Sequence, residues 1–371
     1  MFSKKSLTLD DCLTVIFKPT SCCNLKCRYC FSHLNRDKQR KMTKQEIYAA
    51  IDWTISYIKY RDYKAVTWLW HGGEPMLIGV KLFSELTNYL ISEFEKNNIK
   101  ISLSIQTNLT LLSDEWLEIL KKYYKNMVGI SLDFMTHARC DAKGNFYEDK
   151  ILKSIKKLQD SEIGCSGVLT LVTPDNVKLV REMYDFYKKN GLSFQTSRYF
   201  PSTFPLECEK EYILSDQEYS DFLIKLFDIW FNDPDPQIEI LNLRELAVGL
   251  LTGTRNICVA QKSGCTQRII CIEAGGEIYN CGRYDSPEYL IGTVFDSIQT
   301  ISEKISMRST YTLPAKCLKC KFFKICNGGC RYERDINGKF IDCSVTLKIL
   351  SHIENSLKAS GCELANLKER K

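Results

Sequence analysis

The first 200 residues alternate short runs of β-branched and other apolar residues with longer amphipathic stretches. The short runs predict strands, and the longer stretches space their apolar residues as helices do when they bury one face. We expect strands over residues 14–18, 65–70, 99–106, 127–132, 165–173 and 192–197. We expect helices over residues 43–60, 79–97, 113–124, 145–160 and 176–190. Such repeated strand–helix units predict an α/β fold, either an incomplete barrel or a doubly wound sheet, with its chemistry at the carboxyl ends of the strands.

The pattern changes after residue 200. Residues 201–205 combine two prolines with serine and threonine, which indicates a turn or linker. Two more helical patterns follow, over residues 215–231 and 242–252. From Cys258 onward, short strands, glycines and cysteines leave little room for an apolar core, so we expect this part to fold around metal. The predicted domains are residues 1–230 and 231–371, because the chain is too long for one core.

Cysteine is the unusual component, with 18 among 371 residues. A chain of this length does not need disulfides for stability. The first residues show no secretory signal and no stretch approaches about 18 consecutive apolar residues, so we expect no membrane span and a cytoplasmic location. Thiols stay reduced there, which favours metal ligation or redox chemistry. The net charge of +6 comes from basic residues interspersed with acidic ones, so we expect no nucleic-acid partner.

The first cysteine group lies in the loop after the first predicted strand. Cys23, Cys27 and Cys30 have the spacing C-x3-C-x2-C. Three thiolates in one loop can hold three corners of a 4Fe-4S cluster and leave one iron open to a substrate or cofactor. A zinc site, which needs a fourth ligand, and chance clustering are the alternatives. Cys22 lies outside the spacing and is expected to be a neighbour of the site.

The residues around this loop carry a family resemblance. Tyr29 precedes the last cysteine, and a glycine-rich segment follows the second predicted strand. That segment consists of Gly72, Gly73, Glu74 and Pro75. Together these motifs resemble the signature of radical S-adenosylmethionine (SAM) enzymes. The resemblance implies that the glycine-rich backbone approaches the methionine amino group of SAM, which glycines allow because they lack a side chain.

The resemblance extends to the ends of the third and fourth strands. It implies that the polar residues there line the SAM site and the substrate cavity: Gln106, Asn108, Ser131 and Asp133. Arg139 is the residue implied to pair with the SAM carboxylate, because a guanidinium matches the geometry of that group. Leu109 and Phe134 stand where close relatives usually have glycine, so we expect a differently shaped cavity.

The second cysteine group resembles the SPASM extension of radical SAM enzymes that modify peptides and proteins. By this resemblance, one auxiliary 4Fe-4S cluster takes Cys258, Cys265, Cys281 and Cys330. A second takes Cys317, Cys320, Cys326 and Cys343. A pair of zinc-ribbon sites is the alternative, since C-x2-C pairs also suit zinc. Cys271 is expected to be buried as a small apolar residue, and Cys140 is the non-ligand most open to reaction, because it follows Arg139.

The resemblance implies a partial (β/α)6 TIM-like barrel followed by a SPASM domain, with SAM and three 4Fe-4S clusters as cofactors. Reductive cleavage of SAM would give a 5'-deoxyadenosyl radical that abstracts hydrogen from a peptide residue, and the auxiliary clusters would accept a further electron. We therefore expect a maturase that cross-links a ribosomally made precursor peptide, through a C–C cyclophane or a thioether. Its other expected partner is an electron donor such as ferredoxin or flavodoxin.

Two other functions remain open. One is an anaerobic sulfatase-maturating enzyme that forms formylglycine. That branch has an aspartate, thought to act as base, directly after the cysteine that corresponds to Cys281, whereas this chain has Gly282. Asp285 is the nearest carboxylate that could act as the catalytic base. The other function is a metal-stabilised binding protein without SAM turnover.

Overall fold

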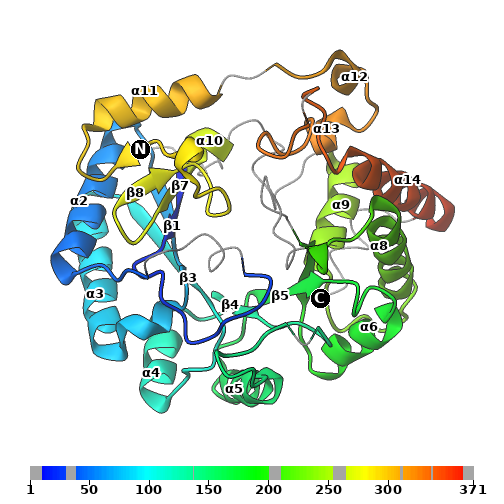
Figure 1. Ribbon diagram of the computed structural model, residues 1–371, viewed down its shortest axis with the longest axis horizontal. Coiled ribbons are helices and arrows are strands. Elements are labelled where there is room, and N and C mark those ends of the chain that lie inside the picture. The colour runs from blue at the N-terminus through cyan, green and yellow to red at the C-terminus, as the bar shows by residue number, and fades with distance from the viewer. Residues whose placement is uncertain are drawn as a thin grey trace, which may run out of the picture.

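Six parallel strands form the centre of the molecule. The computed structural model describes residues 11–30, 39–136, 138–199, 210–253, 265–309, 312–335 and 337–361. The parallel strands are β1 (Cys12–Phe17), β2 (Ala65–Trp70), β3 (Lys100–Thr107), β4 (Val128–Ser131), β5 (Gly167–Val172) and β6 (Phe194–Arg198). They lie side by side in chain order, and each pairs with the next in parallel. Helices follow the strands and surround them as an open ring (Figure 1). The α/β fold and all six predicted strands are confirmed.

The helices of the first part fall where the sequence pattern predicts them. They are α2 (Lys44–Tyr60), α3 (Val80–Lys96), α4 (Asp114–Tyr123), α5 (Glu148–Asp160), α6 (Val180–Lys189), α8 (Asp216–Phe231) and α9 (Leu241–Thr252). Thr43 and Ser215 begin α2 and α8 with capping boxes, in which the side chain of each cap and a glutamate three residues later satisfy each other's backbone N–H groups. A short 3-10 helix, η2 (Pro75–Ile78), separates β2 from α3.

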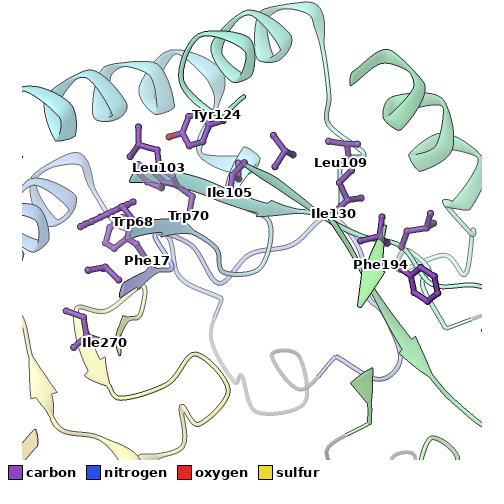
Figure 2. Close-up of a cluster of buried hydrophobic side chains, with 14 of the residues drawn as sticks. Phe17, Trp68, Trp70, Leu103, Ile105, Leu109, Tyr124, Ile130, Phe194 and Ile270 are labelled. Atoms are coloured by element: carbon purple, nitrogen blue, oxygen red, sulfur yellow. The ribbon is translucent and has the colours of Figure 1, made fainter. Parts of the chain in front are cut away.

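The main apolar core lies between the sheet and the helices. Alternate residues of β1 and β2 are buried, as expected for strands with one helix-covered face. Phe17, Trp68 and Trp70 come from this face and contact one another through their rings. Figure 2 shows them beside Ile105 and Tyr124, between the strands and the covering helices. This core fixes the ends of β1 to β4 and therefore the loops that leave them.

The C-terminal part continues the same sheet across the predicted domain boundary. After the short helix α10 (Cys265–Arg268), β7 (Ile269–Ile272) pairs in parallel with β1. The next two strands, β8 (Glu277–Tyr279) and β9 (Gly292–Thr293), are antiparallel, so the sheet has nine strands in the described residues. Cys271 lies fully buried in β7, as the sequence predicts. The cysteine-rich part is thereby attached directly to the strand that precedes the first cysteine loop.

Several helices of the C-terminal part were not predicted. They are α11 (Ile298–Ser309), α12 (Ala315–Leu318), α13 (Phe323–Cys326) and α14 (Cys343–Ser360), with a 3-10 turn, η4, at Pro287–Tyr289. Helix α14 begins at a predicted cluster cysteine and packs against α8 and α9 through buried residues such as Ile349 and Ile353. The C-terminal part therefore has more apolar packing than its cysteine content indicates. Among the described helices, none has the length and apolar character that a bilayer crossing requires.

Candidate active site

The first cysteine loop is held by backbone hydrogen bonds to residues 138–140. The N–H of Lys26 donates to the carbonyl of Cys140 (2.7 Å), and the N–H of Arg28 donates to the carbonyl of Ala138 (2.9 Å). Residues 138–140 belong to the connection after β4, so the loop after β1 is fixed by a loop from across the sheet. Cys140 is buried and its thiol donates to the carbonyl of Lys26 (3.6 Å), which gives it a structural role.

The glycine-rich segment packs directly on this cysteine loop. The N–H of Gly73 donates to the carbonyl of Thr20, and the N–H of Glu74 donates to the carbonyl of Cys22, both at 2.9 Å. A Cβ atom on Gly73 would lie 2.1 Å from the carbonyl oxygen of Cys22, and one on Gly72 would lie 2.3 Å from that of Thr20. The glycines are therefore needed for contact between the two loops, in addition to the expected approach to SAM.

Replacing Gly73 with alanine is expected to displace the cysteine loop and to lower the iron content of the reconstituted protein. The new Cβ would overlap backbone atoms, which cannot move as a flexible side chain does. Iron analysis and the visible absorption spectrum would measure the loss. Gly79→Ala is the control, since its Cβ would meet no atom within 4 Å and carries only the strain of a φ of 88°. Equal iron in the Gly73 variant and the parent would contradict the prediction.

Glu74 is a buried carboxylate that joins the ends of β2 and β3. Its Oε1 accepts hydrogen bonds from the hydroxyl of Thr107 (2.8 Å) and the N–H of Met76 (3.0 Å), and its Oε2 accepts from the N–H of Asn108 (2.8 Å). Burial raises the pKa of Glu74 to about 7, against the effect of these donors. These three hydrogen bonds hold the end of β3 and the start of η2 around Glu74, beneath the loops.

Asn108 braces the first cysteine loop. Its amide donates to the side-chain oxygen of Asn24 (3.1 Å) and lies 3.8 Å from the sulfur of Cys23. Asn24 donates in turn to the hydroxyl of Thr110 (2.7 Å). The next residue, Leu109, has a φ of 60°, in the left-handed region that favours glycine. Its side chain is fully buried, so this chain combines a left-handed backbone with an apolar contact at a position where the family resemblance led us to expect glycine.

The remaining predicted SAM-site residues form two separate groups of hydrogen bonds. The amide of Gln106 donates to the hydroxyl of Ser131 (2.9 Å) between neighbouring strands β3 and β4. Asp133 accepts hydrogen bonds from the hydroxyl of Tyr29 and from Nε of Arg139 (3.2 Å), and Arg139 also donates to the Tyr29 oxygen (2.5 Å). Burial raises the pKa of Tyr29, so its hydroxyl stays protonated. The guanidinium expected to bind SAM is thus held by a carboxylate of the protein.

The thiols of the first cysteine group are suited to bind an iron–sulfur cluster. Burial raises the pKa of Cys23 to about 12 and that of Cys27 to about 11, and the neighbouring thiols contribute in the same direction. Thiolates at such positions need compensating positive charge, which iron ions supply when thiols lose their protons on binding. The three cysteines therefore fit the open 4Fe-4S cluster that the radical SAM resemblance implies.

Four cysteines of the C-terminal part line a single cavity. Its volume is about 290 Å³, and its walls include Phe322, Phe340 and Leu350. The four cysteines are Cys317, Cys320, Cys326 and Cys343, the set predicted for one auxiliary cluster. A cavity of this size is larger than one zinc ion needs and fits an iron–sulfur cluster. In the described ranges, no three His, Cys, Asp or Glu side chains are grouped as ligands of a single metal ion.

The other predicted auxiliary set is described in part. Cys281 follows β8 and interacts electrostatically with Cys330, whose pKa burial raises to about 12. Tyr332 interacts electrostatically with both Cys265 and Cys281. These three cysteines are therefore brought to one region by α10, β8 and the loop before α14. Cys258 lies outside the described residues.

Lys18 is a site residue that the sequence analysis did not single out. It follows β1, its side chain is 1% exposed, and its Nζ donates to Oε1 of Glu273 (2.5 Å) and to the carbonyl of Gly282 (2.9 Å). The Asp285 carboxylate, the predicted base, lies 3.8 Å from the same nitrogen. Burial alone lowers the pKa of Lys18, but the surrounding groups Cys271, Glu273 and Asp285 outweigh it and raise the pKa. A lysine that ends an apolar strand just before a cysteine loop is the signal that could have revealed it.

Known proteins of similar sequence belong to the family that the site residues indicate. Residues 17–187 match the Radical SAM superfamily. The chain is 30% identical over 347 residues to the cysteine-type anaerobic sulfatase-maturating enzyme of Clostridium novyi, across 88% of this chain and 89% of that protein.

Two solved structures have the same fold. The structure of native anSMEcpe with bound AdoMet and Kp18Cys peptide has a TM-score of 0.81 at 24% identity and covers 94% of this chain and 99% of its own. The structure of SuiB of Streptococcus suis bound to precursor peptide SuiA has a TM-score of 0.56 at 20% identity. The match covers 90% of this chain and 75% of the SuiB chain.

Three kinds of observation now coincide: the cysteine loop with its glycine-rich support, the cysteine-lined cavity of the C-terminal part, and similarity over most of the chain. The radical SAM family implies SAM and a 4Fe-4S cluster. The expectation of a metal-stabilised binding protein is set aside, because the relative that shares 30% identity over most of the chain is an enzyme. The chain belongs to the radical SAM superfamily and, within it, to the family of maturases that includes the cysteine-type anaerobic sulfatase-maturating enzyme of Clostridium novyi.

Proposed function

We propose that this maturase oxidises a residue of a ribosomally made peptide and joins it to a second residue in an intramolecular cross-link. The proposed cofactors are SAM and three 4Fe-4S clusters, one on Cys23, Cys27 and Cys30 and two on the C-terminal cysteines. When bound, SAM and the first cluster supply a carbon radical that removes a hydrogen atom from an unactivated carbon. The substrate radical then attacks its partner group, and one electron and one proton must leave to complete the bond.

The observation that carries this proposal is the surroundings of Gly282. A Cβ at this position would lie 3.1 Å from Cδ1 of Ile16 and 3.8 Å from Cε of Lys18, so position 282 faces the end of β1. Glycine provides no side-chain base there. The carboxylates of Glu273 and Asp285 both lie against the buried ammonium of Lys18. To take a proton from a substrate, either carboxylate would have to give up its contact with this ammonium.

The absence of a side-chain base at position 282 favours one kind of cross-link. Formation of formylglycine, or of a thioether, removes a proton from a hydroxyl or thiol of the substrate, which needs an effective base. Attack of a carbon radical on an aromatic ring, followed by loss of one electron, leaves a cationic ring that gives up its proton readily. Asp285 would suffice for that last step. We therefore propose the carbon–carbon form of the cross-link over the thioether.

Formylglycine formation is the second candidate, because the Clostridium novyi relative that matches most of the chain is named a cysteine-type anaerobic sulfatase-maturating enzyme. On this alternative, Asp285 would take the proton of the substrate thiol or hydroxyl. It would have to do so while lying 3.8 Å from the Lys18 ammonium. The two candidates differ in the atoms that the substrate loses, which mass spectrometry reads directly.

The test is anaerobic incubation of the reconstituted enzyme with SAM and dithionite, with either a candidate precursor peptide from a neighbouring small gene or a sulfatase-derived peptide. A cross-link removes two hydrogen atoms and leaves a segment that resists fragmentation. Formylglycine made from cysteine loses the sulfur and yields an aldehyde that hydroxylamine traps. Cross-linking of the precursor supports the proposal. An aldehyde in the sulfatase peptide, with an unchanged precursor, would overturn it in favour of the second candidate.

A further inference from the structure

A group of exposed lysines and leucines lies on α12 and α13, beside the first turns of α14. We call it the α12–α13 surface. Its lysines fall within nine residues of the chain and are Lys316, Lys319, Lys321 and Lys324. Two large apolar side chains are exposed beside them, Leu318 at 61% and Leu347 at 41%. Because Lys316 and Leu347 line one cavity, α12 and the start of α14 belong to the same surface.

The acidic groups around this surface do not neutralise it. Glu354 binds Lys321 at 2.7 Å and Lys358 at 3.3 Å. The carboxylate of Asp335 accepts hydrogen bonds from backbone N–H groups of its own turn. Among the residues that the structure describes, no ion pair is formed by Lys316, Lys319 or Lys324. Positive charge is therefore left beside exposed apolar side chains, which is the composition of a binding surface for an acidic polypeptide.

The α12–α13 surface is attached to the edge of the sheet that carries the candidate active site. Arg198 ends β6, and its guanidinium binds both Asp216, at 3.0 Å, and Asp342. Asp342 directly precedes Cys343, the first residue of α14. The start of α14 is therefore fixed at the carboxyl end of β6, and the first cysteine loop leaves the carboxyl end of β1 in the same parallel sheet. Figure 1 shows α12, α13 and α14 along one side of the ring.

The chain's own terminal segments do not match this surface in charge. Residues 1–10 contain two lysines and one aspartate, and residues 362–371 contain three basic and two acidic residues. A second copy of the chain has a net charge of +6 and is repelled by unpaired lysines. The partner that the charge favours is a different polypeptide, rich in carboxylates.

We infer that the α12–α13 surface is the docking site of an acidic segment of the peptide substrate, one with apolar side chains among its carboxylates. The carboxylates pair with the lysines that have no ion pair, and the apolar side chains cover Leu318 and Leu347. The inference rests on the proposed function, in which the substrate is a peptide. A segment bound here holds the residue to be modified at a high local concentration beside the strand ends.

The test measures binding alone, by fluorescence anisotropy under anaerobic conditions without SAM or reductant. The probe is a short fluorescein-labelled peptide whose glutamates and leucines are spaced as on an amphipathic helix. We expect saturable binding to the iron-loaded protein. The Lys319→Glu/Lys324→Glu variant should bind the probe at least about fivefold more weakly, because two attractive charges become repulsive. The difference should shrink as salt screens the charges.

Matched variants separate docking from a general effect of charge. Lys121→Glu/Lys153→Glu makes the same change in charge on exposed positions of α4 and α5, far from α12 in Figure 1, and should leave the affinity unchanged. Leu318→Ser keeps every charge, so it should weaken binding of the probe and not of a polyglutamate peptide, which has no apolar side chains. Circular dichroism and iron analysis check that each variant keeps the fold of the parent.

The precursor peptide from a neighbouring small gene should displace the probe from the surface. Equal affinity of the parent and a correctly folded Lys319→Glu/Lys324→Glu variant would overturn the inference. Equal weakening in the α4–α5 control, or a probe affinity that Leu318→Ser does not change, would reduce the surface to a non-specific anion-binding patch and would also overturn it. Displacement by an unrelated acidic protein but not by the precursor would assign the surface to another partner. The proposed function fails separately, if SAM and dithionite leave the precursor unmodified, because the binding measurement needs no turnover.

Discussion

Lys18→Met is expected to lower the free energy of unfolding by about 3–5 kcal/mol, the usual cost of removing one partner from a buried ion pair. The loss leaves the Glu273 carboxylate without the Lys18 ammonium at 2.5 Å, and it frees the carbonyl of Gly282 next to Cys281. Because that carbonyl adjoins a predicted cluster ligand, we also expect less iron in the C-terminal part. Urea unfolding followed by circular dichroism, and iron analysis of the reconstituted protein, would measure the two effects.

One matched control changes a surface lysine, and a second removes both partners of the Lys18–Glu273 ion pair. Lys81→Met, on the exposed face of α3, should change stability by no more than about 0.5 kcal/mol. The double variant Lys18→Met/Glu273→Leu should recover part of the loss, because both partners of the main ion pair are then apolar. If Lys18→Met costs no more than the Lys81 control, the buried network does not hold β1, β7 and the loop after β8 together.

The sequence was sufficient to predict elements whose signals are local. Strands β1 to β6 have apolar runs, and the cysteines that line the cavity have a recognisable spacing. Lys18 shows the limit of this approach, because its partner Glu273 is 255 residues away in the chain. The contact exists only because β7 pairs with β1, a register that neither strand indicates alone. Helix α14 was not predicted, because the cysteine spacing that ends at Cys343 indicates a metal site and does not indicate that a helix begins there.

The glycine-rich segment shows a different limit. Its sequence predicts a turn that admits close approach, but it does not identify what approaches. The structure places the backbone of Thr20 and Cys22 there, so the motif supports the cysteine loop as well as the expected SAM site. Arg139 is similar: its chemistry predicts a carboxylate partner, and the carboxylate present is that of Asp133. In both cases residue type predicts the kind of contact, and only the fold identifies the partner.

Asp133→Ala is expected to cost about 3–5 kcal/mol of stability, because it leaves the buried guanidinium of Arg139 without its carboxylate. The variant also removes the acceptor for the hydroxyl of Tyr29, beside Cys30, and for the N–H of Leu171 (2.9 Å). Urea unfolding would measure the loss. Asp160→Ala, which removes an exposed carboxylate bound to Lys156 on α5, should cost less than about 0.5 kcal/mol.

Variants of Arg139 and Asp133 can test whether Arg139 binds SAM. Arg139→Lys keeps the charge that faces Asp133 but loses the planar pair of donors that a carboxylate prefers. If Arg139 also reaches the SAM carboxylate, this variant should weaken SAM binding at least about tenfold, as loss of a charge-assisted hydrogen bond does, while Asp133→Asn leaves the guanidinium available and weakens binding less. Equilibrium dialysis with labelled SAM on the iron-loaded protein measures both. Equal SAM affinity in Arg139→Lys and the parent would restrict Arg139 to its contacts with Asp133 and Tyr29, and the SAM carboxylate would then need another partner at the ends of β3 and β4.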